Sequence, residues 1–217
     1  MSDQLLLLRE VLANIDENSC PKNINLHCHT LLSDGSLSPI ELISQAYSIG
    51  LRHIAVTDHH TVDSFSIITN WLKDNNHLPS LPFFWSGIEI SCLLKGCLVH
   101  LIGLGFNTES EFIKPYILGD APNGNFLQAN VAVKSIHEAG GISILAHPAR
   151  YRLPYSELIK EAFSIGFDGV EVWYDYDMSV DWRPSRLICN SINSQVTALQ
   201  MLKSCGTDTH GLSLLGR

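Results

Sequence analysis

The chain contains little charge and no long apolar run. Charged residues make up 17% of its 217 residues, and the apolar run near its start, Leu5 to Leu8, is followed directly by Arg9 and Glu10. A membrane-spanning helix needs roughly 20 apolar residues in a row. A secretory signal needs a basic start and a longer apolar stretch. We therefore expect neither feature.

Basic side chains are also scarce relative to acidic ones. The chain has 14 Lys and Arg against 22 Asp and Glu, which gives a net charge of −8. Stable binding to duplex nucleic acid or to an anionic surface depends on a basic footprint that contacts phosphates. We therefore expect no stable duplex nucleic-acid binding and no membrane partner, while the oligomeric state stays open.

The six cysteines show no C-x-x-C spacing. A chain of this length can bury a substantial core without disulfides, and disulfides belong mainly to secreted proteins. We therefore expect reduced thiols and a cytoplasmic protein.

Short apolar runs alternate with helical patterns along the chain. Strands are expected at residues 23–30, 53–58, 83–91, 98–106, 142–147, 168–174 and 201–207, and helices at 38–50, 62–74, 126–139, 155–165 and 183–199. Strands and helices that alternate with short loops are typical of a parallel α/β fold. Leucines at helical spacing also predict a packing helix within residues 1–22, ahead of one domain over residues 23–217.

Six of the ten histidines, together with three carboxylates, fall at or near the ends of the expected strands. They are His27, His29, Asp34, His59, Glu89, His100, His147, Asp208 and His210. The H-x-H pair places two imidazoles on one strand face, and functional groups of parallel α/β folds gather at the carboxyl ends of strands. A single histidine on a strand is more often structural, but nine such residues favour a metal centre. Nitrogen and oxygen ligands suit Zn, Mn or Fe.

These residues lie in stretches that resemble the PHP (polymerase and histidinol phosphatase) superfamily of metal-dependent phosphoesterases. The stretches are HCHTLLSDGSLSP, LRHIAVTDHHT, GIEIS, VHLIGLGF, ILAHPARY, GVEVWY and CGTDTHG, in the family's order. Two of them, SDGSLSP and AHPARY, are most similar to stand-alone phosphoesterases that act on nucleoside 3′,5′-bisphosphates and short oligonucleotide ends. The helical insertion usual in that subgroup is shortened here to residues 107–140. In addition, His60 stands where the subgroup often has Asp.

The resemblance implies a distorted (β/α)7 barrel with two or three divalent metal ions, in a trinuclear centre when all are bound. One metal would be held by His27, His29, Glu89 and Asp208. A second would be held by His100 and His147 with Glu89 as a bridge, and the third by Asp34, His59 and His210. Because every position carries a residue able to bind metal, the resemblance implies an active enzyme.

The expected reaction is in-line attack of a metal-bound hydroxide on a phosphate monoester, because bound water loses its proton near neutral pH. Asp58 and His59 are candidates to act beside this hydroxide, although Asp58 is equally suited to stabilising a turn. Arg150 is expected to bind phosphate oxygens with its planar guanidinium. Arg152 and Lys95 are weaker candidates for the same role.

The expected substrate is a small phosphorylated metabolite, in particular a nucleotide such as a nucleoside 3′,5′-bisphosphate or a short oligonucleotide end. One alternative with the same fold is a histidinol-phosphate phosphatase. An alternative from another class is a non-catalytic metal-binding regulatory module. Two features depend on tertiary structure: the reach of His60, and the loop-like segment 107–125, which is expected to cover one face of the fold.

Overall fold

The computed structural model describes residues 3–179 and 181–217. The described helices are α1 (Asp3–Ala13), α2 (Pro39–Ile49), α3 (Asp63–Asp74), α4 (Ala129–Glu138), α5 (Tyr155–Ile165) and α6 (Arg186–Ala198), with 3-10 turns η1 (Lys114–Tyr116), η2 (Gly124–Leu127) and η3 (Pro148–Arg150). The strands are β1 (Ile24–Asn25), β2 (His53–Ala55), β3 (Phe83–Trp85), β4 (Gly87–Leu94), β5 (Cys97–Leu104), β6 (Ile142–Leu145), β7 (Gly169–Trp173) and β8 (Leu202–Cys205). Each expected helix is present.

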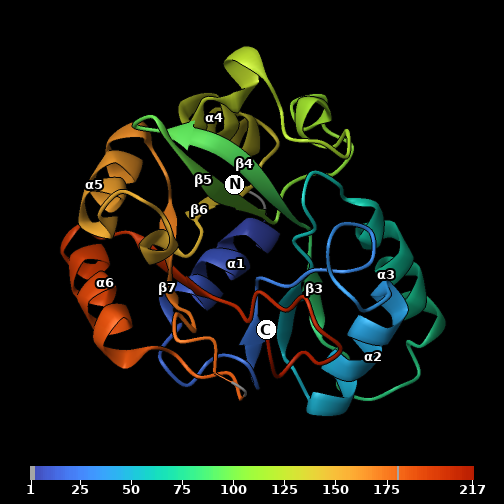
Figure 1. Ribbon diagram of the computed structural model, residues 1–217. Helices are drawn as coiled ribbons and strands as arrows, with labels where there is room; N and C mark the ends of the chain where they lie inside the picture. Colours follow the sequence, from blue (N-terminus) through green and yellow to red (C-terminus); the bar gives the residue numbers. More distant parts are fainter. Residues whose placement is uncertain (1–2, 180) are drawn as a thin grey trace.

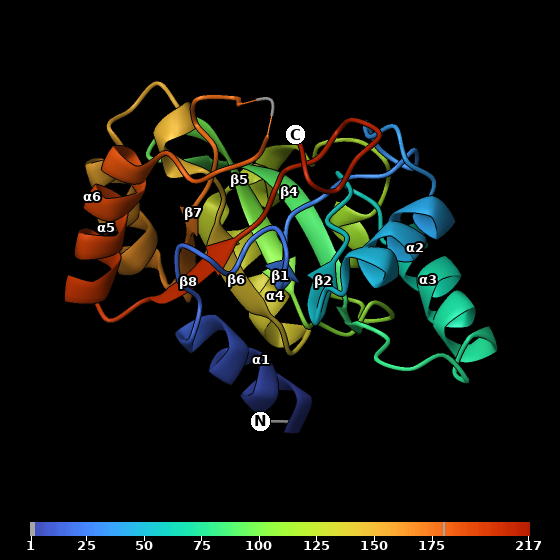
Figure 2. The same ribbon diagram turned by 90° about the horizontal axis from the view of Figure 1, so that it is seen from below.

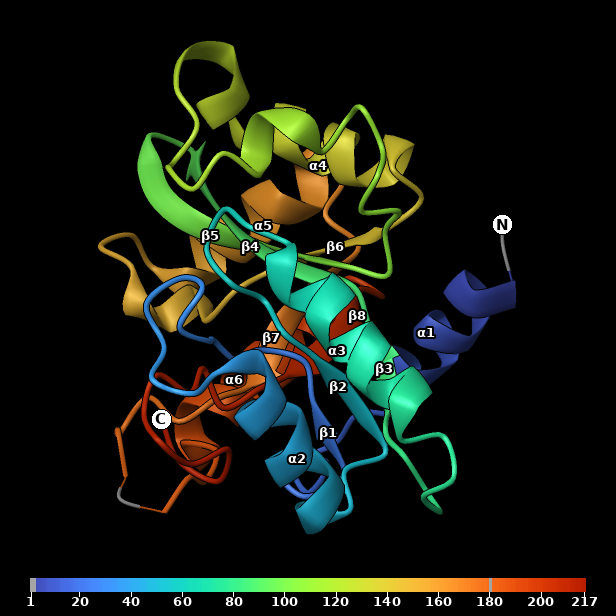
Figure 3. The ribbon, with the colours of Figure 1, turned by 90° about the vertical axis from the view of Figure 1, so that its right-hand side faces the viewer.

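The strands form two sheets inside a layer of helices, which confirms the predicted α/β fold (Figure 1). One sheet has the order β1-β2-β3 and is parallel, and the other has the order β4-β5-β6-β7-β8. Helices α2 and α3 cover the three-stranded sheet (Figure 3). Helix α1 packs against β8 at the opposite end from the chain's C-terminus (Figure 2).

The barrel implied by the resemblance is not closed by continuous ladders. Isolated parallel bridges join the two sheets at both seams, Cys28 to Thr209 on one side and His59 to Glu89 on the other. Strand β1 is only two residues long, so the H-x-H segment lies beyond its regular pairing. Backbone hydrogen bonds still hold this segment, since Asp208 N donates to His27 O at 2.8 Å and His29 N to Thr209 O at 3.1 Å.

The larger sheet is mixed rather than purely parallel. Strand β5 pairs antiparallel with both β4 and β6. The reason lies in the turn Lys95-Gly96, whose φ angles of 53° and 71° are left-handed. Two such residues make the tight turn that joins antiparallel strands. The expected strand 83–91 is also divided, between β3 and β4 at Ser86.

Local signals account for the best-defined helix boundaries. Helix α2 begins after Ser38, whose side chain accepts from Glu41 N while Glu41 accepts from Ser38 N, a capping box that satisfies two donors of the first turn. It ends at Gly50, whose φ of 81° favours glycine. Helix α1 buries Leu8 and Leu12 completely in the core. Among the described helices, none is long and apolar enough to cross a membrane.

The segment 107–125 packs on the main hydrophobic core through Ile113 and Tyr116. Ile113 and Tyr116 are fully buried, and Gly119 N donates to His60 O at 3.0 Å. The His60 ring also faces this side, because its Nε2 accepts from Ser91 N at 3.3 Å. His60 therefore ties the loop after β2 to β4 and to this segment.

Candidate metal centre

The nine predicted ligands converge at one end of the two sheets. Each comes from a strand or from the loop that follows one: His27, His29 and Asp34 after β1, His59 after β2, Glu89 in β4, His100 in β5, His147 after β6, and Asp208 and His210 after β8. Residues from six chain segments can meet there because neighbouring strands place their ends side by side. Their role as ligands stays a prediction.

The inner group is centred on the carboxylate of Glu89, of which 1% is exposed. Its Oε1 lies 2.8 Å from His100 Nδ1 and 3.2 Å from His147 Nε2. Its Oε2 lies 3.1 Å from the Nε2 atoms of His27 and His29, and 3.4 Å from His59 Nε2. Five imidazoles thus surround one buried carboxylate.

Asp208 completes this inner group on the other side of the H-x-H pair. Its Oδ1 lies 3.3 Å from His27 Nε2 and 3.2 Å from His29 Nε2. Its φ of 53° is left-handed, as is the φ of 23° at His147. Such backbone is unfavourable for residues other than glycine and is concentrated at functional sites.

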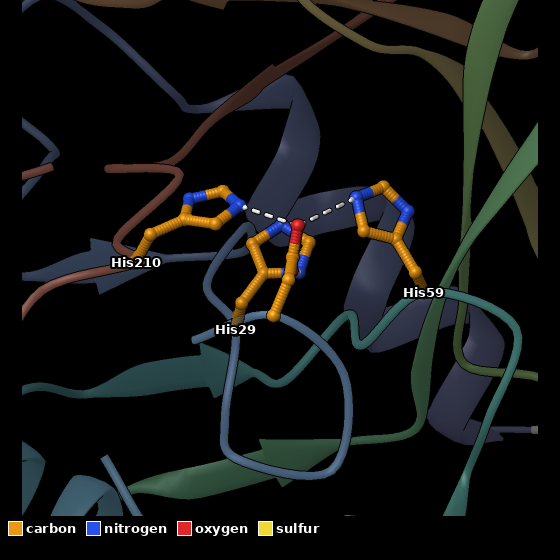
Figure 4. A group of neighbouring side chains, drawn as sticks. His29, His59 and His210 are labelled. Carbon is orange, nitrogen blue, oxygen red and sulfur yellow. Dashed lines mark ion pairs between the residues drawn. The ribbon is translucent and has the colours of Figure 1, made fainter. Parts of the chain in front are cut away.

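The outer group lies nearer the surface and consists of His29, Asp34, His59 and His210. Asp34 Oδ2 lies 3.2 Å from His210 Nε2 and 3.7 Å from His59 Nε2. Figure 4 shows the rings of His29, His59 and His210 turned toward one shared point, with these two ion pairs dashed. His210 Nδ1 donates to Asp208 O at 2.7 Å, which fixes the ring so that Nε2 faces this point.

The geometry of these nitrogens fits a metal better than a hydrogen-bond network. His29 Nε2 is buried and lies within 3.2 Å of two carboxylate oxygens, yet it forms no hydrogen bond of acceptable angle. The same is true of His100 Nδ1, although Glu89 Oε1 is 2.8 Å away. Buried polar atoms are normally hydrogen-bonded. Their orientation is explained if the lone pairs are directed at cations between the side chains.

The electrostatics of the cluster support the same conclusion. Burial alone would raise the pKa of Glu89, but the imidazoles of His27 and His100 hold it well below its usual range. Burial would lower the pKa of His29, but Asp208 and Glu89 outweigh it and raise the value to about 9. Burial instead lowers the pKa of His59 to about 4, because the Glu89 carboxylate only partly offsets it and the charges of His29 and His100 add to it. The buried carboxylates are stabilised by nearby positive charge, but the neighbouring imidazoles cannot all be protonated at once. Divalent cations bound between these side chains would supply that charge.

Glu171, in β7, supports two of the proposed ligands from below. His27 Nδ1 donates to Glu171 Oε1 at 2.9 Å, and His147 N donates to Oε2 at 2.8 Å. These three residues also have metal-ligand spacing. Because both Glu171 oxygens accept hydrogen bonds, we interpret Glu171 as a buried support for His27 and His147 rather than as a further ligand.

Two arginines flank the outer oxygen of Asp208. Arg150 Nη1 lies 2.9 Å from Oδ2, Arg217 Nε lies 3.1 Å from it, and Tyr174 donates its hydroxyl to it at 2.6 Å. Arg150 was expected near the centre. Arg217 was not, because its position depends on how the loop after His210 returns to the sheet, and no local pattern marks it.

The weaker phosphate candidates lie elsewhere. Lys95 forms an ion pair with Glu157 of α5 at 3.0 Å. Arg152 donates to the carbonyl of Gly96, in the β4–β5 turn. The structure therefore places both at the tip of the hairpin and does not bring them into the ligand cluster.

Asp58 makes contacts of a different kind from those of its neighbour His59. Its buried carboxylate accepts from Thr30 N at 2.6 Å, Thr30 Oγ1 at 2.7 Å and Ser33 Oγ at 2.8 Å. Of the two roles weighed for Asp58, these contacts favour the stabilisation of a turn. His59, by contrast, reaches Glu89 and Asp34 directly.

Sequence comparisons find curated relatives, while no protein-family model matches the chain. A 5′-3′ exoribonuclease from Haemophilus influenzae is 26% identical over 70% of this chain and 79% of its own length. A 3′,5′-nucleoside bisphosphate phosphatase from Chromobacterium violaceum is 32% identical, over 39% of this chain and 28% of its own length.

Solved structures share the fold at low sequence identity. An amidohydrolase from Chromobacterium violaceum matches with a TM-score of 0.73 and 19% identity, over 90% of both chains. A metal-dependent phosphoesterase from Bifidobacterium adolescentis matches with a TM-score of 0.70 and 18% identity, also over 90% of both. A PHP-like two-domain protein from Bacteroides vulgatus matches with a TM-score of 0.62 and 15% identity, over 87% of this chain and 52% of its own.

The sequence matches and the shared fold make the chain similar to PHP-like metal-dependent phosphoesterases, which are hydrolases. This confirms the resemblance drawn from its motifs. Within that class, its curated relatives include an exoribonuclease and a nucleoside bisphosphate phosphatase.

Proposed function

We propose that the chain hydrolyses a terminal phosphate ester of a small nucleotide, such as a nucleoside 3′,5′-bisphosphate. The observation that carries this proposal is the ring of five imidazoles around the buried Glu89 carboxylate. The proposed metal ligands are the nine predicted residues. The inner positions are His27, His29, Glu89, His100, His147 and Asp208, and the outer positions are Asp34, His59 and His210. Two or three Zn, Mn or Fe ions held there would supply a nucleophilic water of lowered pKa and a Lewis acid for phosphoryl oxygens.

The chain's own residues are arranged to bind the anionic end of such a substrate. The Arg150 side chain is 40% exposed while one of its nitrogens is fixed by Asp208 and Tyr174. Its remaining N–H groups are therefore oriented in advance for phosphate oxygens. Arg217 adds a second guanidinium against the same carboxylate oxygen. We assign phosphate binding to Arg150 and not to Arg152 or Lys95, whose partners lie on the hairpin and α5.

A second candidate activity is exonucleolytic cleavage at the 5′ end of a short RNA. The relative that aligns over 79% of its own length is a 5′-3′ exoribonuclease, and the same ligand set can act on a phosphodiester. The net charge of −8 favours short substrates over long ones, because a long strand needs an extended basic groove.

The six cysteines are free and buried, which is consistent with the proposed cytoplasmic location.

The test is a hydrolysis assay of metal-loaded protein on three substrates: adenosine 3′,5′-bisphosphate, a 5′-phosphorylated oligoribonucleotide, and histidinol phosphate. We expect phosphate release from the bisphosphate, mononucleotide release from the oligomer if the second candidate is correct, and little turnover of histidinol phosphate. A chelator should abolish activity, and His27→Ala and Asp208→Ala should do the same.

The matched control is His77→Ala, which removes an exposed imidazole from a loop outside the cluster. It should behave as wild type. If no phosphoester is hydrolysed, and His27→Ala binds metal as wild type does, the chain is not an enzyme of this kind and the regulatory-module alternative is favoured.

A further inference from the structure

The outer group differs from the inner group in how its acidic ligand is held. Glu89 and Asp208 are buried, with 1% and 2% of their side chains exposed. Asp34 is 53% exposed and lies in the turn that follows His29. Packing alone therefore does not position the Asp34 carboxylate. Its place depends on the conformation of the turn over residues 30–34.

One buried carboxylate, that of Asp58, accepts three hydrogen bonds from that turn. Asp58 Oδ1 accepts from Thr30 N at 2.6 Å and from Ser33 Oγ at 2.8 Å, and its Oδ2 accepts from Thr30 Oγ1 at 2.7 Å. The Thr30 hydroxyl in turn accepts from Leu32 N at 3.2 Å. Hydrogen bonds to an ionised carboxylate are roughly twice as strong as neutral ones, so Asp58 organises the whole turn between His29 and Asp34.

The backbone leaves this turn little alternative room. Ser33 N and Gly35 N both donate to Thr30 O, at 3.1 and 2.9 Å. A Cβ at Gly35 would lie 2.5 Å from the carbonyl atoms of His29. The turn is therefore folded tightly back on the H-x-H segment. Because the turn has little conformational freedom, a substitution at Asp58 should displace Asp34.

Asp58 also connects the turn to the inner group. Its own carbonyl accepts from Glu89 N at 3.2 Å, and His59 follows it directly in the chain. The same residue thus sets the relative positions of Asp34, His59 and Glu89 without itself facing the shared point of the cluster.

We propose that Asp58 is a positioning residue that determines whether the outer metal position is occupied, by holding Asp34 opposite His59 and His210. The inference rests on the proposed function, in that it takes the cluster to bind metal. It assigns Asp58 no proton transfer and no contact with substrate. The outer position then depends on Asp58, whereas the inner group is held by buried side chains and by Glu171.

The experiment is a metal titration of the purified, chelator-stripped protein by calorimetry with Mn²⁺, together with elemental analysis after dialysis. Asp58→Ala should weaken one class of sites by about 10–100-fold, the usual effect of removing a residue that orients a ligand. Its titration should match that of His210→Ala, which removes an outer ligand, and not that of His100→Ala, which removes an inner one. Asp58→Asn, which keeps an acceptor oxygen, should recover part of the loss.

Ser33→Ala and Thr30→Val each remove one hydrogen-bond donor to Asp58. They test the same inference if Asp58→Ala does not fold. Each should produce a smaller loss at the same class of sites. Asp74→Ala removes an exposed carboxylate at the end of α3 and should bind metal as wild type does. The inference about Asp58 is wrong if Asp58→Ala and both single-donor variants keep the wild-type number and affinity of metal ions, or if they lose an inner site instead. Either result would leave the proposed function standing. A wild-type protein that binds no metal overturns the proposed function with it.

Discussion

His27 Nδ1 donates to Glu171 Oε1 at a distance of 2.9 Å, with both side chains fully buried. Because the carboxylate can only accept when ionised, the hydrogen bond places the imidazole proton on Nδ1. This leaves Nε2, which lies 3.1 Å from Glu89 Oε2 and 3.3 Å from Asp208 Oδ1, to bind a cation held among these side chains, which is the orientation that metal binding requires.

Glu171→Gln should therefore weaken metal binding by about 10–100-fold and lower activity in parallel, because an amide can donate to Nδ1 and reverse the tautomer. Metal titration beside a thermal melt checks this. Glu138→Gln, at an exposed position of α4, is the matched control and should leave both quantities unchanged. Equal metal affinity in the two variants would contradict the role given to Glu171.

Arg150→Met should raise KM for a phosphomonoester by about 10–100-fold, since a charge-assisted hydrogen bond contributes about 1.5–3 kcal/mol. Arg152→Met removes the same group two residues away, where the guanidinium donates to Gly96 O in the β4–β5 turn. It should have a normal KM. Steady-state kinetics of the two variants distinguishes a direct contact with phosphate from a general effect of charge. Equal KM values in the two variants would rule out phosphate binding by Arg150.

Gly206→Ala should displace His27. A Cβ at this position would lie 2.2 Å from His27 Cβ and 2.6 Å from its backbone nitrogen, and His27 is held by Glu171. Overpacking of this kind costs about 1–3 kcal/mol. We expect reduced stability in urea together with weaker metal binding. Gly119→Ala has open space around its added methyl group but a left-handed φ of 85°, so it should lose stability while metal affinity stays normal.

Asp168 lies at the end of the sheets opposite the candidate metal centre, and it should make the free energy of unfolding depend on pH. Partial burial would raise its pKa, but His137, Ser143 N and Arg9 outweigh this and lower it below the ordinary 3.8. A carboxyl group with a lowered folded-state pKa stabilises the fold above about pH 4. This contribution is lost as the pH falls through the folded-state pKa.

Asp168→Asn should accordingly reduce the free energy of unfolding by about 1–3 kcal/mol at pH 7. The deficit relative to wild type should shrink as the pH falls below about 4, where the wild-type carboxylate takes up its proton. Urea unfolding of both proteins across this range is the measurement. A deficit that stays constant or grows toward low pH would show that the ion pairs of Asp168 do not stabilise the fold.

The helices show how much of the fold could be predicted from local pattern. Ser38, Pro39 and Gly50 define the ends of α2 because capping and left-handed backbone are properties of a few neighbouring residues. The antiparallel hairpin of β4 and β5 was missed, because the alternation of apolar residues is the same in parallel and antiparallel strands. Its only local sign is the Lys95-Gly96 turn.

The sequence by itself determined the kind of chemistry, since nine residues able to bind metal, arranged in family motifs, indicate a class of hydrolase whatever the tertiary structure. Only the tertiary structure decided which of these residues meet and what holds them. Glu89 lies among five imidazoles, Asp58 holds the turn of Asp34, and Arg217 reaches Asp208. These contacts join positions far apart in the chain, and their distances are set by how the two sheets come together rather than by spacing along the sequence.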